Sequence, residues 1–110
     1  MRKARAPSRH VTEVLTLLGL QIATARRERR MPAAELAERA GISRDTLHSV
    51  ERGAPGVAIG TVFEVAALLG VPLFTDDAER LPLFVARARD RLSLLPARVR
   101  TPSNPVREDF

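Results

Sequence analysis

A short run of polar residues near the middle of the chain is the strongest candidate for chemistry. It lies in residues 41–53, which read GISRDTLHSVERG. Arginine can donate two parallel hydrogen bonds to a guanine edge, and aspartate and serine can bond to other base edges. Ser43 suits the N-cap of a helix and Gly53 its end, so a short helix is predicted to present these side chains. A helix that follows a tight glycine turn is the geometry that enters the major groove of DNA.

The preceding residues predict a second short helix, packed against the first. Pro32 suits its first turn, where the missing N–H costs nothing. Leu36, Ala37 and Ala40 supply its buried side. Gly41 is expected to end it in a left-handed conformation. The two helices are therefore predicted to form a helix-turn-helix pair.

The remaining apolar pattern predicts an all-α fold. A first helix is expected over residues 11–30 and a fourth over residues 58–69, each with apolar residues at helical spacing. The inward positions are Leu15, Leu18, Ile22 and Ala25 in the first helix, Leu47 and Val50 in the third, and Val62, Val65, Ala66 and Leu69 in the fourth. The next apolar residues, Val71, Leu73 and Phe74, are expected to fold back as a short fifth turn or helix that seals the core.

The character of the chain changes after Thr75. Pro82 opens a predicted helix with a single apolar stripe, formed by Phe84, Val85, Ala88, Leu92 and Leu95. Residues 96–110 contain three prolines and are expected to be extended. The predicted organisation is a basic N-terminal arm over residues 1–10, a DNA-binding domain over residues 11–75, and a C-terminal helix and tail over residues 76–110 for dimerisation or partner binding.

Composition narrows the possible functions. The formal net charge is +5, and all 18 basic residues except Lys3 are arginine, which suits contact with phosphate. There is no cysteine, so thiol catalysis and zinc fingers are excluded. No apolar run is long enough for a membrane helix, and no signal-peptide core follows the N-terminus, so a cytoplasmic protein is expected. The two histidines, His10 and His48, are not part of a catalytic or metal-binding motif, so neither enzymatic activity nor a cofactor is expected.

Residues 18–74 resemble the Cro/C1-type (XRE family) helix-turn-helix domain. The specific features are LA-x-x-A-G-I-S from Leu36 to Ser43, the inward Leu47, the E-R-G ending at Gly53, and A-x-L-L-G-V from Ala66 to Val71. The resemblance covers about half of the chain without gaps. It implies a five-helix domain of the lambda-repressor type, to which this chain adds the C-terminal helix and extended tail.

The resemblance also implies roles for individual residues. The likeness assigns base reading to Arg44, Asp45, His48 and Ser49, and capping or phosphate contact to Ser43 and Thr46. Asp45 would either accept a hydrogen bond from cytosine, orient Arg44, or only favour the helix dipole. Phosphate contacts are expected from Arg27, Arg29, Arg30 and Arg52 and from the backbone around Gly56. Arg26 and Glu51 fall where the resemblance implies an internal ion pair.

Two features depart from the family pattern. Ala33 stands where the family often has a glutamine that supports a phosphate contact, and the loop over residues 54–58 has no lysine or arginine. These departures leave open an adapter protein that no longer binds DNA.

Two further alternatives concern the C-terminal segment. Most small domains of this type are repressors that bind palindromic operators as homodimers. The chain may then be a stand-alone regulator, or an antitoxin similar to the HipB type that binds a HipA-like toxin kinase and represses its own operon. In the second case the expected partner-binding residues are Arg98, Arg100, Asp109 and Phe110.

Overall fold

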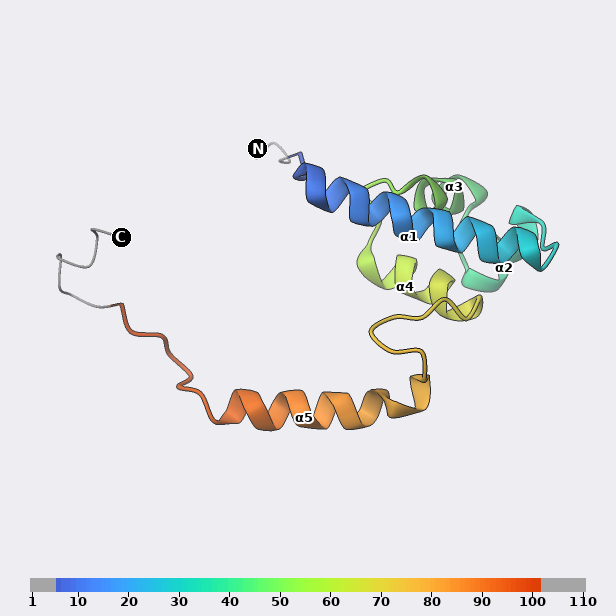
Figure 1. Cartoon of the computed structure of the whole chain (residues 1–110). Helices are drawn as coiled ribbons and strands as arrows, with labels where there is room; N and C mark the ends of the chain where they lie inside the picture. The colour runs from blue at the N-terminus through green and yellow to red at the C-terminus, as the bar shows by residue number, and fades with distance from the viewer. Residues whose placement is uncertain (1–5, 102–110) are drawn as a thin grey trace. The chain divides into compact units, whose positions relative to one another are not determined.

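The structure, a computed structural model, describes residues 6–101, and every regular element in that range is helical. The chain order is α1 (Arg9–Glu28), α2 (Ala33–Ala40), α3 (Arg44–Arg52), α4 (Ile59–Leu68), the short 3₁₀ helix η1 (Ala78–Arg80) and α5 (Leu81–Ser93) (Figure 1). The predicted all-α class is confirmed. The chain divides into two compact units, one ending at Asp76 and the other beginning at Asp77.

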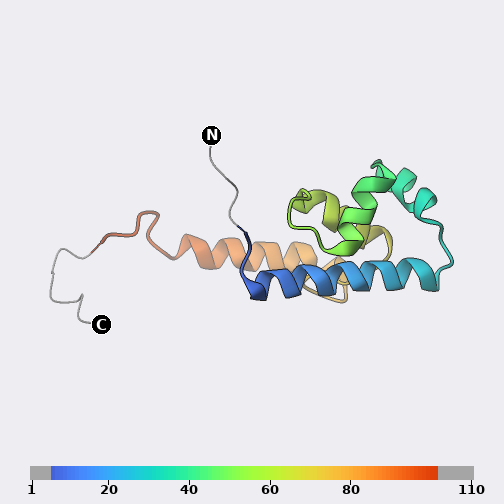
Figure 2. The ribbon, with the colours of Figure 1, turned by 90° about the horizontal axis from the view of Figure 1, so that it is seen from above.

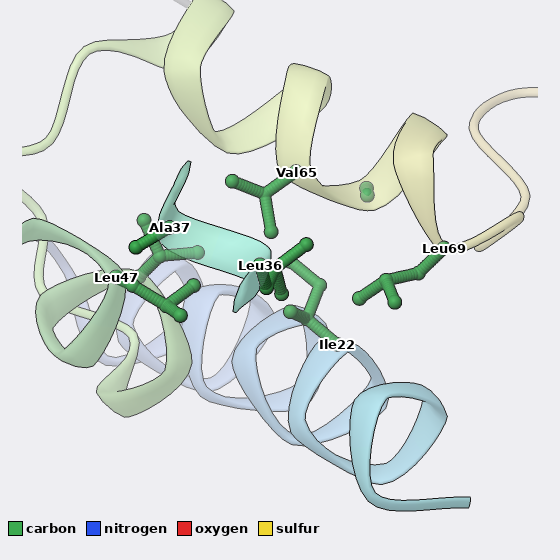
Figure 3. Close-up of a cluster of buried hydrophobic side chains, with 8 residues drawn as sticks. Ile22, Leu36, Ala37, Leu47, Val65 and Leu69 are labelled. Carbon is green, nitrogen blue, oxygen red and sulfur yellow. The ribbon is translucent and has the colours of Figure 1, made fainter. Parts of the chain in front are cut away.

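The first unit is built around a small aliphatic core. Its buried residues are Ile22, Leu36, Ala37, Leu47, Val50, Val65, Ala66 and Leu69. Figure 3 shows side chains from all four helices pointing toward one another. Fully burying each leucine, isoleucine or valine contributes about 1.5–3 kcal/mol relative to exposure. This core fixes one side of α2 and of α3, and so determines which residues of α3 face the solvent.

α1 is the long helix on which the others assemble. It begins at Arg9, two residues earlier than expected, because the Ser8 hydroxyl accepts a hydrogen bond from the Val11 amide at 3.2 Å. Helices α2, α3 and α4 lie on one side of α1, and its N-terminal end projects beyond them (Figures 1 and 2). Of the four inward positions predicted for α1, only Ile22 is fully buried; Leu18 and Ala25 pack at the edge of the core.

The short fifth turn or helix expected at Val71, Leu73 and Phe74 is not a helix. Residues 71–76 form bends and irregular backbone. Pro72 explains the difference, because it donates no backbone hydrogen bond and disfavours a helical conformation at Val71. Val71 and Leu73 pack against the core as expected, whereas Phe74 is 91% exposed and therefore does not seal it.

The second unit consists of η1, α5 and the following irregular segment. α5 starts at Leu81, one residue before the predicted start, and ends at Ser93. None of its residues is buried. The guanidinium of Arg80 lies 5.2 Å from the centre of the Phe84 ring. The predicted apolar stripe therefore exists as a helix face, but no element of its own unit covers it.

Candidate nucleic-acid interface

The α2–α3 turn places one face of α3 at the surface. Gly41 ends α2 with φ of 71°, and Ser43 caps α3, so only residues 41–43 separate the two helices. Leu47 and Val50 are 1% and 3% exposed, which fixes their side of α3 in the core. The opposite side of α3 must therefore face the solvent, because residues three and four apart share a helix face.

The predicted base-reading residues occupy this outer face. Arg44, Asp45 and His48 are exposed, whereas Ser49 is half-buried. The Ser49 hydroxyl accepts a hydrogen bond from the Arg52 guanidinium at 3.3 Å. Arg44 and Asp45 stand in the first turn of α3, with His48 one turn further on. The face therefore offers guanidinium and imidazole donors and a carboxylate acceptor to whatever approaches it.

Ser43 and Thr46 are occupied by the cap of α3. The Ser43 hydroxyl accepts from the Thr46 amide at 3.0 Å and donates to the Thr46 hydroxyl at 3.0 Å. A capping side chain of this kind contributes about 1 kcal/mol to helix stability. In this structure the two hydroxyls thus serve α3 itself.

A hollow between α1 and α3 gathers basic groups beside the outer face. Its volume is about 330 Å³, and it is lined by Leu20, Ala23, Thr24, Arg27, His48, Glu51 and Arg52. It brings Arg27 from α1 together with His48 and Arg52 from α3. The sequence gave each arginine a phosphate role separately, but did not predict that they share one hollow with His48. An anion seated there would meet two guanidinium groups at once.

Arg26 and Glu51 are joined through two hydrogen bonds. The Arg26 Nε donates to Glu51 Oε2 at 2.7 Å, and its terminal nitrogen donates to Oε1 at 3.1 Å. The other terminal nitrogen donates to the Met31 carbonyl at 2.9 Å. The two side chains are only 12% and 13% exposed. The hydrogen bond to Glu51 raises the pKa of Arg26, against a smaller opposing effect of burial.

The approach of α1 to α3 depends on two glycines. A Cβ built on Gly19 would lie 2.5 Å from the Glu51 carbonyl oxygen, and one on Gly53 would lie 2.9 Å from the Leu15 carbonyl oxygen. Gly53 also has φ of 77°, which favours glycine. The sequence predicted Gly53 as the end of α3 but gave no role to Gly19. Contact with a helix distant along the chain leaves no local signal in a single glycine.

The other predicted contact residues are spread over the surface. Arg29 and Arg30 are exposed at the end of α1, where Arg30 has φ of 54°, and Gly56 is exposed in the loop before α4. A Cβ at Gly56 would meet nothing within 4 Å, so its backbone is accessible. Arg98 and Arg100 are exposed in the segment after α5. Asp109 and Phe110 lie outside the described residues.

Two searches of residues 6–101 gave no hit. No group of three or more histidine, aspartate or glutamate side chains is placed to hold a metal ion there. None of the helices in that range is both long enough and apolar enough to cross a membrane.

Comparison with known proteins gives one match. A family model described as a helix-turn-helix domain matches residues 17–81, which is more than half of the chain. The match spans α1 to η1 and includes the α2–α3 turn and the outer face of α3. No curated protein and no solved structure matches the chain.

Proposed function

The chain belongs to the helix-turn-helix domain family of DNA-binding regulators, and we propose that it is a sequence-specific repressor that binds a palindromic operator as a homodimer. The observation that carries the proposal is the outer face of α3, where Arg44, Asp45 and His48 are exposed beside the hollow that contains Arg27. The first turn of such a helix is the part that meets base edges in the major groove.

Base reading is assigned to the first half of α3. Arg44 donates two hydrogen bonds to guanine, and Asp45 either accepts one from cytosine or orients Arg44. His48 reaches the next base along the groove. Ser49 contributes through the Arg52 guanidinium that it already binds. Each good bidentate contact favours the right base by about 1–3 kcal/mol.

Phosphate contacts surround this reading face. Arg27 and Arg52 line the hollow between α1 and α3 and suit a phosphate of one strand. Arg29, Arg30 and the accessible backbone at Gly56 suit phosphates further along. Contacts of this kind fix the register of the protein on DNA without selecting a sequence. They also compensate for the absence of basic side chains in residues 54–58.

Autoregulation is the simplest biological form of this activity, and it sets the experiment. Fluorescence anisotropy would compare DNA from upstream of the protein's own gene with scrambled DNA over a salt series. We expect a clear preference for the upstream DNA, and we expect Arg44→Ala to abolish that preference. Equal, weak and strongly salt-dependent binding to both DNAs would contradict sequence-specific repression and favour an adapter that has lost operator recognition.

A second role is suggested by the C-terminal unit. α5 carries an uncovered apolar stripe, and exposed Arg98 and Arg100 follow it. These features support an antitoxin in which residues 96–110, including Asp109 and Phe110, capture a HipA-like toxin kinase. Deleting those residues separates this role from that of a stand-alone repressor. Loss of toxin capture alone supports the antitoxin role, whereas loss of dimerisation assigns the segment to self-association.

A further inference from the structure

The outward side of α4 carries a patch of apolar residues. Ile59, Phe63 and Ala67 follow one another at four-residue spacing and therefore lie on one stripe. Ile59 is 70% exposed and Phe74 is 91% exposed. The Phe74 ring meets the Phe63 ring edge-on, with 6.4 Å between centres and 88° between planes. These four residues, Ile59, Phe63, Ala67 and Phe74, are called the α4 patch below.

Two properties of the α4 patch are unusual for a surface that stays in water. α4 has only one charged residue, Glu64, although a surface helix normally carries a charged outer face. Phe74 has φ of 68°, a conformation that bulky residues rarely adopt. The backbone thus holds a large aromatic ring in the solvent instead of turning it inward. Strained residues of this kind cluster at functional sites.

We propose that the α4 patch is the dimer interface, covered by the same patch of a second copy related by a two-fold axis. The proposal rests on the proposed function, which requires a symmetrical dimer. The chain carries a net charge of +5, so two copies repel each other when their arginine-rich faces meet. The α4 patch contains no basic residue, so a second copy can bury it without an unpaired guanidinium.

The position of the α4 patch also suits DNA binding. Seven residue steps lead from Arg52, the end of α3, to Ile59, the start of α4. Even a fully extended chain of that length spans no more than about 25 Å. A two-fold contact at Ile59 therefore keeps both copies of α3 near the axis. Half-sites on successive turns of DNA, about 34 Å apart, are within reach of that arrangement.

The apolar stripe of α5 fits a second copy less well. Arg80, Arg87, Arg89 and Arg91 surround that stripe, and Asp90 is the only acidic residue of the helix. Pairing two copies of α5 would bring arginines together with few carboxylates to balance them. This charge pattern favours an acidic partner for α5 and leaves self-association to the α4 patch.

The test is sedimentation of the full chain over a range of loading concentrations. We expect wild type to move from monomer to dimer as its concentration rises. Ile59→Glu should weaken dimerisation at least tenfold, because two carboxylates would face a buried apolar surface. Leu92→Glu is the matched control, since Leu92 is 69% exposed on the stripe of α5, and it should dimerise like wild type.

A second variant guards against misfolding. Phe74→Asn keeps a residue that tolerates positive φ, so the fold should persist while the dimer is lost. Thermal unfolding at concentrations where wild type is monomeric should give the same midpoint for all variants. A monomeric wild type at every concentration, or loss of the dimer in Leu92→Glu but not in Ile59→Glu, would overturn the proposal.

Binding to a DNA fragment with one half-site separates the two proposals. Ile59→Glu should bind that fragment as wild type does, because α3 is untouched. If wild type dimerises through the α4 patch but shows no preference for its upstream DNA, the repressor function fails while the interface stands. If it prefers that DNA but Ile59→Glu still dimerises fully, the interface fails while the repressor function stands.

Discussion

At the scale of single residues, the Arg26–Glu51 pair carries the largest expected contribution to stability. Arg26 makes three hydrogen bonds from a nearly buried position, two to Glu51 and one to the Met31 carbonyl. Arg26→Met removes them and leaves the Glu51 carboxylate without its cation. Loss of one partner of a buried pair costs about 3–5 kcal/mol, so we expect the free energy of unfolding to fall by about that amount in urea denaturation.

The double variant Arg26→Met with Glu51→Leu is the control for this prediction. It removes both charges, so it should recover much of the loss, as replacement of a buried pair by apolar residues often does. If the single and the double variants are equally unstable, the loss comes from packing and the Met31 contact, and the ion pair is not the cause.

Arg27 and Arg44 should affect DNA binding in different ways. Arg27 lies in the hollow between α1 and α3 and is assigned to phosphate, so Arg27→Ala should weaken binding to all sequences alike. It should also reduce the slope of log affinity against log salt by about one. Arg44→Lys keeps the charge but loses the planar fork, so it should lower the preference for upstream DNA and leave the slope unchanged.

Anisotropy titrations of both variants at several salt concentrations check this pair of predictions. The upstream DNA and its scrambled version serve as the two probes. A change of slope in Arg44→Lys, or a change of sequence preference in Arg27→Ala, would show that the roles of the two arginines have been exchanged.

At the scale of elements, the packing of α1 on α3 depends on Gly19. Any side chain there would meet the Val50 and Glu51 carbonyl oxygens, both closer than 3 Å to an added Cβ. Because these are backbone atoms, Gly19→Ala must move the helices apart, and we expect a loss of about 1–3 kcal/mol from overpacking. The Arg26–Glu51 geometry should loosen as well, since the same two helices hold it.

Gly60→Ala provides the matched control on α4. Nothing lies within 4 Å of a Cβ at that position, and alanine is the better helix former by about 1 kcal/mol. Thermal unfolding should therefore show a lower midpoint for Gly19→Ala and an equal or higher one for Gly60→Ala. A drop of equal size in both variants would mean that the helix approach at Gly19 is less tight than the structure has it.

Local signals in the sequence were enough to predict the α2–α3 turn. Gly41, Ser43 and Gly53 act within their own helix ends, and Leu47 and Val50 declare the inner side of α3 by spacing alone. The outer face follows from these by geometry. The likeness to a known family added the pairing of Arg26 with Glu51, which spacing could not supply.

Features that depend on distant contacts were not predictable in this way. Gly19 has meaning only because α3 passes against it. Phe74 was expected in the core because it is apolar, yet Pro72 prevents the helix that would have turned it inward. The hollow shared by Arg27, His48 and Arg52 likewise needs the relative position of α1 and α3. The sequence alone carries the composition of these features but not their arrangement.

At the scale of the whole molecule, the chain separates three surfaces by their chemistry. The outer face of α3 is polar and basic, the α4 patch is apolar and uncharged, and the stripe of α5 is apolar with arginines around it. In our proposals each surface takes a different partner: DNA, a second copy and an acidic protein. Mutations in one surface should therefore leave the other two interactions nearly unchanged.

Ending the chain at Asp76 tests this separation. Every buried residue in the described part of the chain lies between Gly19 and Leu69, and Val71 and Leu73, which pack at the edge of the core, are retained. The shortened chain should therefore fold, with a free energy of unfolding within about 0.5 kcal/mol of wild type, as for surface changes. Because it keeps the outer face of α3 and the α4 patch, it should also dimerise and prefer upstream DNA. Sedimentation and anisotropy measure both. A shortened chain that folds but stays monomeric would move self-association to the second unit, and α5 would then be the element that brings two DNA-binding units together.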